Sequence, residues 1–326
     1  MKMCIYGAGA IGGLAAAWLA RSGHDVSVVA RGAHLTAIRE RGLRVESERA
    51  PVTEKVRAES DPARIGPQDY VIVAVKGQSM REVAATIAPL LGKHTCVLTA
   101  MNGVPWWFFD RLRFGEGKLR LESLDPGGGI AQAIPTERVI GCVVHLAASI
   151  EAPGVIRHNM GSRLIIGEPG GRNTERTERL AHELRNAAFE TIVSPFIERD
   201  FWVKLLGNIS FNPVSALTLA TADRLLADAE VKAYMVEIMR ECLAIGRAIG
   251  VDADIDPEAR MDMARALGRF KTSMLQDLEA GKGLEIDGLL TGTLEIADKA
   301  GVPAPFTRSL LGLTRVRADS TKQYPR

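Results

Sequence analysis

Hydrophobic and polar positions divide the chain into two parts with different periodicities. In the first part, short and nearly continuous apolar runs alternate with segments of helical spacing. Strands that are apolar throughout and are joined through helices predict a parallel sheet covered on both faces. The predicted strands are residues 1–7, 24–31, 69–76 and 95–103, with helices at 10–23 and 80–91.

The second part of the chain has helical periodicity. After further strand-like runs between residues 138 and 169, a helix and a last extended piece lead to residue 197. From there the apolar positions recur at helical spacing, and we find no convincing strand pattern. The sequence therefore predicts an α/β domain over residues 1–195 and an all-α domain over residues 196–326.

Composition and charge exclude several classes of protein. The 326 residues are 46% hydrophobic, and 41 basic residues nearly balance 39 acidic ones. A net charge of +2 provides no general attraction to nucleic acid or to an anionic membrane. The sequence contains no apolar run of the roughly 20 residues that a membrane helix needs, and its start does not resemble a signal peptide. We therefore expect a cytoplasmic protein with reduced thiols at its four widely spaced cysteines, Cys4, Cys96, Cys142 and Cys242.

The segment GAGAIG at residues 7–12 follows the first strand directly and opens the first helix. In this context the G-x-G-x-x-G pattern predicts a Rossmann-type dinucleotide site. Gly7 permits a tight turn, Gly9 lets the backbone approach a pyrophosphate, and Gly12 allows the helix to pack closely on the strand. The helix N-terminus supplies amide donors for the phosphates. An ordinary glycine-rich turn is the alternative.

The end of the second predicted strand bears on the choice of cofactor. Arg31 occupies the place where an acidic residue would bind the ribose hydroxyl of NAD, and no Asp or Glu lies between Val26 and Ile38. A guanidinium suits a 2′-phosphate, so NADP(H) is favoured over NAD(H). An exposed arginine without a ligand is the alternative. Lys76 and Asn102 end two further strands, where ligands of such sheets bind, although either could be a surface loop residue.

Polar residues recur every four positions in KLLGNISFNP, residues 204–213. On a helix this spacing places Lys204, Asn208 and Asn212 on one stripe, with apolar residues on the other sides. We expect Pro213 to bend or interrupt the helix just after Asn212. A lysine and two amides among apolar residues need partners, which a polar ligand would supply. The alternative is a hydrated stripe that faces the other domain.

With these segments in place, the chain resembles the ketopantoate reductases (2-dehydropantoate 2-reductases) over nearly its whole length. The blocks K-x-x-x-N-x-x-x-N-P and S-M-L-Q-D…E-I-D are distinctive, whereas the glycine block is not. The resemblance implies a Rossmann-type domain, a helical domain and an active site in the cleft between them. It also implies reduction of 2-dehydropantoate to (R)-pantoate by NADPH in pantothenate and coenzyme A synthesis.

The resemblance also implies roles for single residues. Lys204 would be the general acid that protonates the carbonyl oxygen, and Glu285 would orient it. The substrate would be held by Asn208, Asn212 and Ser273 together with Lys204 and Asn102. The cofactor would contact the following residues: Gly7, Ala8, Gly9, Ala10, Ile11, Gly12, Arg31, Lys76, Asn102, Ala147 and Glu285.

Three departures from the family pattern concern the substrate. The segment after Asn102 is longer than in the simplest members, and its aromatic run Trp106–Phe109 is open to two interpretations, a lid over the site or plain packing. Ala222 and Phe270 stand where some members carry asparagine. A different branched or aromatic 2-oxo acid is therefore an alternative substrate.

A non-catalytic NADP(H) sensor is an alternative from another class, but it has no use for Lys204 with Glu285. Hydrolase and metalloenzyme patterns are missing, and we expect no metal site. The expected ligand is a small 2-oxo acid, with no nucleic acid or membrane as partner. The sequence leaves open whether two copies form a homodimer.

Overall fold

The computed structural model describes residues 1–117, 119–266 and 268–324. Two compact units divide the chain: Met1–Met101 groups with Gly128–Ile197, and Asn102–Gly127 groups with Glu198–Arg326. A single division at residue 195 would leave Asn102–Gly127 in the first domain, but the contacts of this segment place it in the helical unit. The reason is the apolar run after Asn102, which is buried there.

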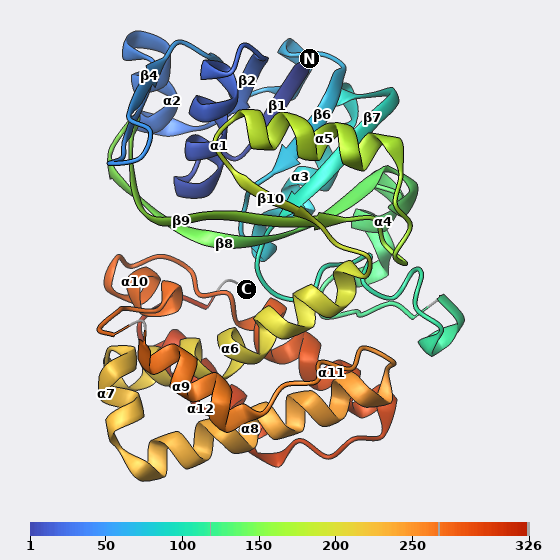
Figure 1. The fold of residues 1–326 in the computed structure, drawn as a ribbon, viewed down its shortest axis with the longest axis vertical. Coiled ribbons are helices and arrows are strands. Elements are labelled where there is room, and N and C mark those ends of the chain that lie inside the picture. Colours follow the sequence, from blue (N-terminus) through green and yellow to red (C-terminus); the bar gives the residue numbers. More distant parts are fainter. Residues whose placement is uncertain (118, 267, 325–326) are drawn as a thin grey trace. The chain divides into compact units, whose positions relative to one another are not determined.

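The first unit is built on one sheet. Among the described residues, ten strands form it in the order β4-β3-β9-β8-β7-β6-β1-β2-β5, with β10 beside β9 (Figure 1). The strands are β1 (Lys2–Tyr6), β2 (Asp25–Val29), β3 (Leu43–Glu46), β4 (Val52–Glu54), β5 (Arg57–Glu59), β6 (Gln68–Val73), β7 (Leu91–Ala100), β8 (Val139–Ala152), β9 (Val155–Gly167) and β10 (Glu190–Val193). The helices are α1 (Ala10–Arg21), α2 (Gly32–Arg41), α3 (Met80–Thr86), α4 (Gly129–Ala133) and α5 (Glu175–Asn186).

The predicted Rossmann-type arrangement is confirmed, with a mixed edge. The strands from β5 through β2, β1, β6 and β7 to β8 are all parallel. The hairpin β8–β9 is antiparallel and extends the sheet, and β3–β4 forms a second antiparallel pair. Of the strand-like runs expected between residues 138 and 169, the last two belong to the single strand β9. The two runs form one long strand because β8 pairs with both of them and so supplies partners for their backbone N–H and C=O groups.

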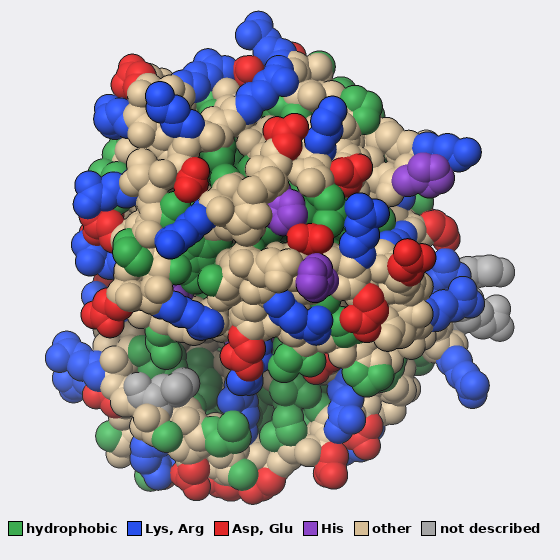
Figure 2. Space-filling view, turned by 45° about the horizontal axis from the view of Figure 1, so that its top comes forward, with side chains coloured by type: hydrophobic (Ala, Val, Ile, Leu, Met, Phe, Trp, Pro, Cys, Tyr) green, Lys and Arg blue, Asp and Glu red, His purple; other side chains and the backbone are tan. Residues whose placement is uncertain are grey.

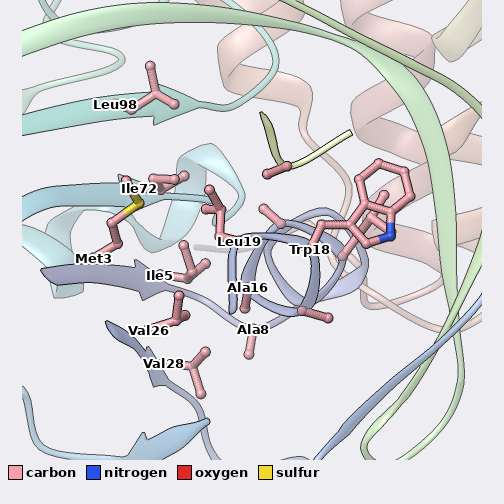
Figure 3. Close-up of a cluster of buried hydrophobic side chains, with 14 of the residues drawn as sticks. Met3, Ile5, Ala8, Ala16, Trp18, Leu19, Val26, Val28, Ile72 and Leu98 are labelled. Carbon is pink, nitrogen blue, oxygen red and sulfur yellow. The ribbon is translucent and has the colours of Figure 1, made fainter. Parts of the chain in front are cut away.

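Helix α1 is the centre of the first unit's core. Figure 3 shows side chains of β1, β2, β6 and β7, among them Met3, Ile5 and Val28, in one buried cluster with side chains of α1. On another side of the helix, the Trp18 ring packs against the rings of His158 and Phe189. Because α1 also contacts β3, β4, β8 and β9, the sheet curls around it. This packing fixes the N-terminus of α1 at the carboxyl end of β1.

The second unit is helical, as the periodicity predicts. Its helices are α6 (Ile197–Thr218), α7 (Ala222–Ala227), α8 (Ala229–Ala248), α9 (Pro257–Ala266), α10 (Ser273–Glu279), the π-helix η7 (Asp287–Thr291), α11 (Gly292–Ala300) and α12 (Pro305–Ser320). Figure 1 draws most of this unit in yellow to red. Of the two outcomes expected at Pro213, a bend or an interruption, the interruption was wrong, since α6 continues to Thr218. Val214 and Ala216 are buried beyond the proline, and this burial offsets the lost backbone hydrogen bond.

Two carboxylates, one buried and one half-buried, join the parts of the helical unit. Glu241 of α8 accepts hydrogen bonds from the backbone nitrogens of Phe306 and Thr307, both at 2.8 Å, and so caps α12. Glu295 of α11 accepts from the backbone nitrogen of Ser123 at 3.0 Å and from its hydroxyl at 2.6 Å. These hydrogen bonds fasten the segment Asn102–Gly127 to the helices.

The surface bears charges of both signs. Lys and Arg side chains alternate with Asp and Glu side chains over the face in Figure 2, in keeping with the balanced composition. Across the described residues, no helix is long and apolar enough to cross a lipid bilayer. The same residues contain no group of three His, Cys, Asp or Glu side chains placed to hold a metal ion.

Candidate active site

The turn between β1 and α1 contains the three glycines of the first motif. Gly7 has a φ of +98°, and a Cβ there would lie 2.5 Å from Cγ1 of Val75. A Cβ on Gly12 would lie 2.0 Å from the carbonyl oxygen of Gly7, whereas a Cβ on Gly9 would meet nothing within 4 Å. Of these three positions, packing therefore excludes a side chain only at Gly7 and Gly12. The space over Gly9, at the N-cap of a 12-residue helix, fits the approach of a pyrophosphate.

Arg31 lies just after β2 and is the N-cap residue of α2. Its Nη1 lies 2.6 Å from Oε1 of Glu82 on α3, and the two side chains are 68% and 51% exposed. The sequence showed no acid near Arg31 because Glu82 is 51 residues away along the chain. Parallel pairing of β2, β1 and β6 brings their carboxyl ends to one edge of the sheet, and with them α3. An exposed ion pair of this kind is weak, so an anion can displace Glu82 at little cost.

Lys76 follows β6 at the same edge, as the N-cap residue of a short 3-10 turn, and is half-buried. The two residues before it lie against the glycine turn, since a Cβ on Gly7 would be 2.9 Å from the carbonyl oxygen of Ala74. Ala147 lies within β8, where it faces Met160 of β9. The segment that carries Lys76 thus lies close in space to the glycine turn. Ala147 lies elsewhere, in the β8–β9 hairpin.

The polar stripe of α6 is present in the helical unit. Lys204 Nζ donates a hydrogen bond to Oδ1 of Asn102 at 2.8 Å, and both residues are half-buried. Farther along the helix, Asn212 is 6% exposed and its Nδ2 donates to Oγ of Ser273 at 3.3 Å. Asn208 is half-buried on the same face. The four-residue spacing places three of the predicted substrate-binding residues on one helix face, and tertiary contacts add the other two, Asn102 and Ser273.

A close contact between two glycines positions Asn102 and the turn after Glu285. Gly103 has a φ of +79°, and a Cβ there would lie 2.5 Å from the carbonyl oxygen of Gly288. The same oxygen accepts a hydrogen bond from Val104 N at 3.0 Å. Gly288 belongs to η7, which begins two residues after Glu285. π-Helical turns are frequent at functional sites. No local pattern predicts this one, because the helical periodicity of the segment is continuous.

The aromatic run after Asn102 is part of the core, so the interpretation as a lid was wrong. Trp107 and Phe108 are both 0% exposed. The Trp107 ring meets Phe201 of α6 edge to face, with centroids 5.4 Å apart, and Phe108 lies 5.7 Å from Trp202. Rings buried in this way anchor the segment that carries Asn102 to the helix that carries Lys204.

Two further expectations concern residues without polar roles. All four cysteines are buried and free, and burial raises the pKa of Cys4 to about 12, so this thiol stays protonated.

Ala222 and Phe270, the two positions that depart from the asparagine pattern, are adjacent: Ala222 N donates to the carbonyl oxygen of Phe270 at 3.0 Å.

The matches to known proteins cover both units. The family model Ketopantoate reductase PanE/ApbA matches residues 3–106, and the model of its C-terminal part matches residues 197–318. A 2-dehydropantoate 2-reductase of Mesorhizobium japonicum is 45% identical over 97% of both chains. The chain thus belongs to the ketopantoate reductase family, which consists of NADP-dependent oxidoreductases acting on CH-OH donors.

Solved structures agree with this assignment. A crystal structure from Ralstonia solanacearum assigned to the ketopantoate reductases is 49% identical, covers 99% of both chains and has a TM-score of 0.94. A 2-dehydropantoate 2-reductase from Geobacter metallireducens is 30% identical, with a TM-score of 0.85 over 97% of this chain and 99% of that one. A D-mandelate dehydrogenase with NADH and anilino(oxo)acetate shares the fold at 20% identity and a TM-score of 0.85 over 99% of both chains.

Proposed function

We propose that this protein reduces 2-dehydropantoate to (R)-pantoate with NADPH, a step of pantothenate synthesis. The observation that carries the proposal is the half-buried ammonium of Lys204, which is held by Asn102 on the polar face of α6. Bound NADPH supplies a hydride to the C2 carbonyl carbon. As negative charge develops on the carbonyl oxygen, Lys204 stabilises it and transfers a proton to it.

The remaining polar groups of the stripe would position the substrate. The Asn208 and Asn212 amides can bind hydroxyl and carboxylate oxygens, and the Ser273 hydroxyl lies 3.3 Å from the Asn212 amide. Asn102 restrains Lys204, because its Oδ1 accepts one of the three ammonium protons. We also propose that Glu285, at the entry to η7, orients Lys204. Groups fixed in this way reduce the entropy lost at the reacting step.

The glycine turn, Lys76 and Arg31 would hold the cofactor in the first unit. The amides at the start of α1 would bind the pyrophosphate over Gly9. Packing within the protein leaves room for a side chain at this position, so the open space is available to the cofactor. The Arg31 guanidinium would exchange Glu82 for the 2′-phosphate.

The activity is tested by following NADPH oxidation with a panel of 2-oxo acids that includes 2-dehydropantoate, a larger branched acid and an aromatic acid. We expect the highest kcat/KM with 2-dehydropantoate. The aromatic acid belongs in the panel because enzymes named for different substrates share this fold. Preference for it would support the alternative substrate class, and no turnover with any 2-oxo acid would refute the proposal.

Replacing Arg31 by alanine should weaken NADPH binding by about ten- to a hundredfold and leave NADH binding nearly unchanged, since charge-assisted hydrogen bonds to the 2′-phosphate are lost. Glu82→Gln should tighten NADPH binding by a few fold at most, because the exposed pair with Arg31 is weak. Dissociation constants of both cofactors measure the effect. Arg41→Ala on the same helix, also exposed, is the matched control. If Arg31→Ala weakened the binding of NADPH and NADH equally, the proposed contact between Arg31 and the 2′-phosphate would be refuted.

A further inference from the structure

Arg260 of α9 is a cation without a counterion among the described residues of the helical unit. Its side chain is half-buried, and no hydrogen bond or ion pair to its guanidinium occurs within residues 1–117, 119–266 and 268–324. Its Nε is fully buried and unpaired. Burial lowers the pKa of Arg260, and no nearby acid opposes this effect. The neighbouring Glu258 pairs instead with Lys232, at 2.6 Å. A buried charge without a partner is costly, and arginine suits paired anions.

The guanidinium of Arg260 lies on the face of α6 that carries the proposed proton donor. A Cβ placed on Gly207 would lie 3.2 Å from Nη2 of Arg260. Gly207 stands one turn after Lys204 and directly before Asn208, and all three are half-buried. The missing side chain at Gly207 leaves the space that the guanidinium uses. The guanidinium of Arg260 therefore lies against the stretch of α6 between Lys204 and Asn208.

Two cationic side chains, Lys204 on α6 and Arg260 against Gly207 one turn later, favour an anionic ligand at this stretch of the helix. A 2-oxo acid carries its carboxylate one bond from the carbonyl that Lys204 would protonate. The Ser273 hydroxyl and the asparagine amides can hydrogen-bond that carboxylate but cannot neutralise it. A guanidinium can do both, through two parallel N–H···O bonds.

We propose that Arg260 binds the carboxylate of the 2-oxo acid substrate and selects carboxylates over neutral ketones. This inference rests on the proposed function and deepens it. Lys204 then acts on the carbonyl oxygen, and Arg260 holds the adjacent carboxylate, which fixes the orientation of the carbonyl. Gly207 is part of the same arrangement because it admits the guanidinium to the helix face.

The test compares a 2-oxo acid with its neutral 2-oxo amide in the wild-type enzyme, Arg260→Ala and Arg260→Lys. Arg260→Ala should raise KM for the acid by about ten- to a hundredfold, as expected for a lost hydrogen-bonded charge pair. KM for the amide and for NADPH should stay unchanged, and Arg260→Lys should recover part of the loss. Arg265→Ala, on the same helix with an exposed side chain paired to Asp262, is the control and should behave as wild type.

Gly207→Ala provides a second variant, in which the arginine at position 260 is retained. The new methyl group would press on the guanidinium, so KM for the acid should rise while the melting temperature does not fall. An unchanged KM for the acid in Arg260→Ala would overturn the inference. So would equal effects on acid and amide, or a raised KM for NADPH, which would assign Arg260 to folding or to the cofactor.

Binding of the 2-oxo acid in the presence of NADP⁺, which cannot reduce it, measures the role of Arg260 without turnover. If the wild type turns over 2-oxo acids and Arg260→Ala binds them as tightly, the inference fails and the proposed function stands. If the wild type binds the acid through Arg260 but reduces none, the proposed function fails and the carboxylate site stands. If the wild type neither reduces nor binds 2-oxo acids, both fail.

Discussion

Replacing Lys204 by alanine should lower kcat for 2-oxo acid reduction by at least about a hundredfold, the lower range for loss of a general acid. The variant has no group to protonate the carbonyl oxygen as hydride arrives. It also removes the ammonium that stabilises the developing charge, so both losses act on the same step. The measurement is steady-state NADPH oxidation at saturating substrate, together with the dissociation constant of NADPH, which should stay unchanged.

The control for this prediction is Lys271→Ala. Lys271 is an exposed lysine of the same unit that pairs with Glu279, at 2.8 Å, and its loss should leave kcat unchanged. Asn102→Ala should give an intermediate effect, because it leaves the ammonium in place but removes its partner at 2.8 Å. A kcat for Lys204→Ala within a few fold of the wild type would exclude Lys204 as the proton donor.

Replacing Trp107 by alanine should lower the free energy of unfolding of the helical unit by about 3–5 kcal/mol, the usual cost of a large cavity in a core. Trp107 is fully buried and stacks edge to face on Phe201 of α6. The loss should also reduce activity, since the aromatic run keeps Asn102 beside Lys204. Urea unfolding followed by circular dichroism measures the stability, and NADPH oxidation measures the activity.

Phe306→Ala is the matched control for this substitution. Phe306 is 40% exposed and packs against Tyr234, so its removal leaves no enclosed cavity and should cost much less than the loss of Trp107. A lid residue would behave differently from a core residue. If Trp107→Ala changed the preference among 2-oxo acids and left the stability unchanged, the assignment of the aromatic run to the core would be wrong.

Most of the fold follows from local patterns in the sequence. The apolar strands and the glycine turn predicted the parallel sheet and the place of α1, because their periodicity and their φ angles are local properties. The four-residue spacing of Lys204, Asn208 and Asn212 likewise predicted one helix face. The error at Pro213 has a tertiary cause, since burial of the helix beyond the proline outweighs the local preference to end it there.

The structure adds to the predictions made from the sequence, or corrects them, at places where segments distant in the chain meet. Glu82 reaches Arg31 across 51 residues, and Gly103 meets Gly288. No local pattern encodes either contact, because each depends on the order of strands or on the path of a loop. The aromatic run Trp106–Phe109 had two possible interpretations for the same reason: its composition suits a lid as well as a core, and only its partners on α6 decide between them.

The sequence by itself determined the class of fold, the dinucleotide turn and the residue types of the polar stripe, since these depend on spacing along a few turns of chain. Only the tertiary structure decided which residues meet: Asn102 with Lys204, Asn212 with Ser273, and Arg260 with Gly207. The physical reason is that side-chain partners are chosen by packing between elements that lie far apart in the chain.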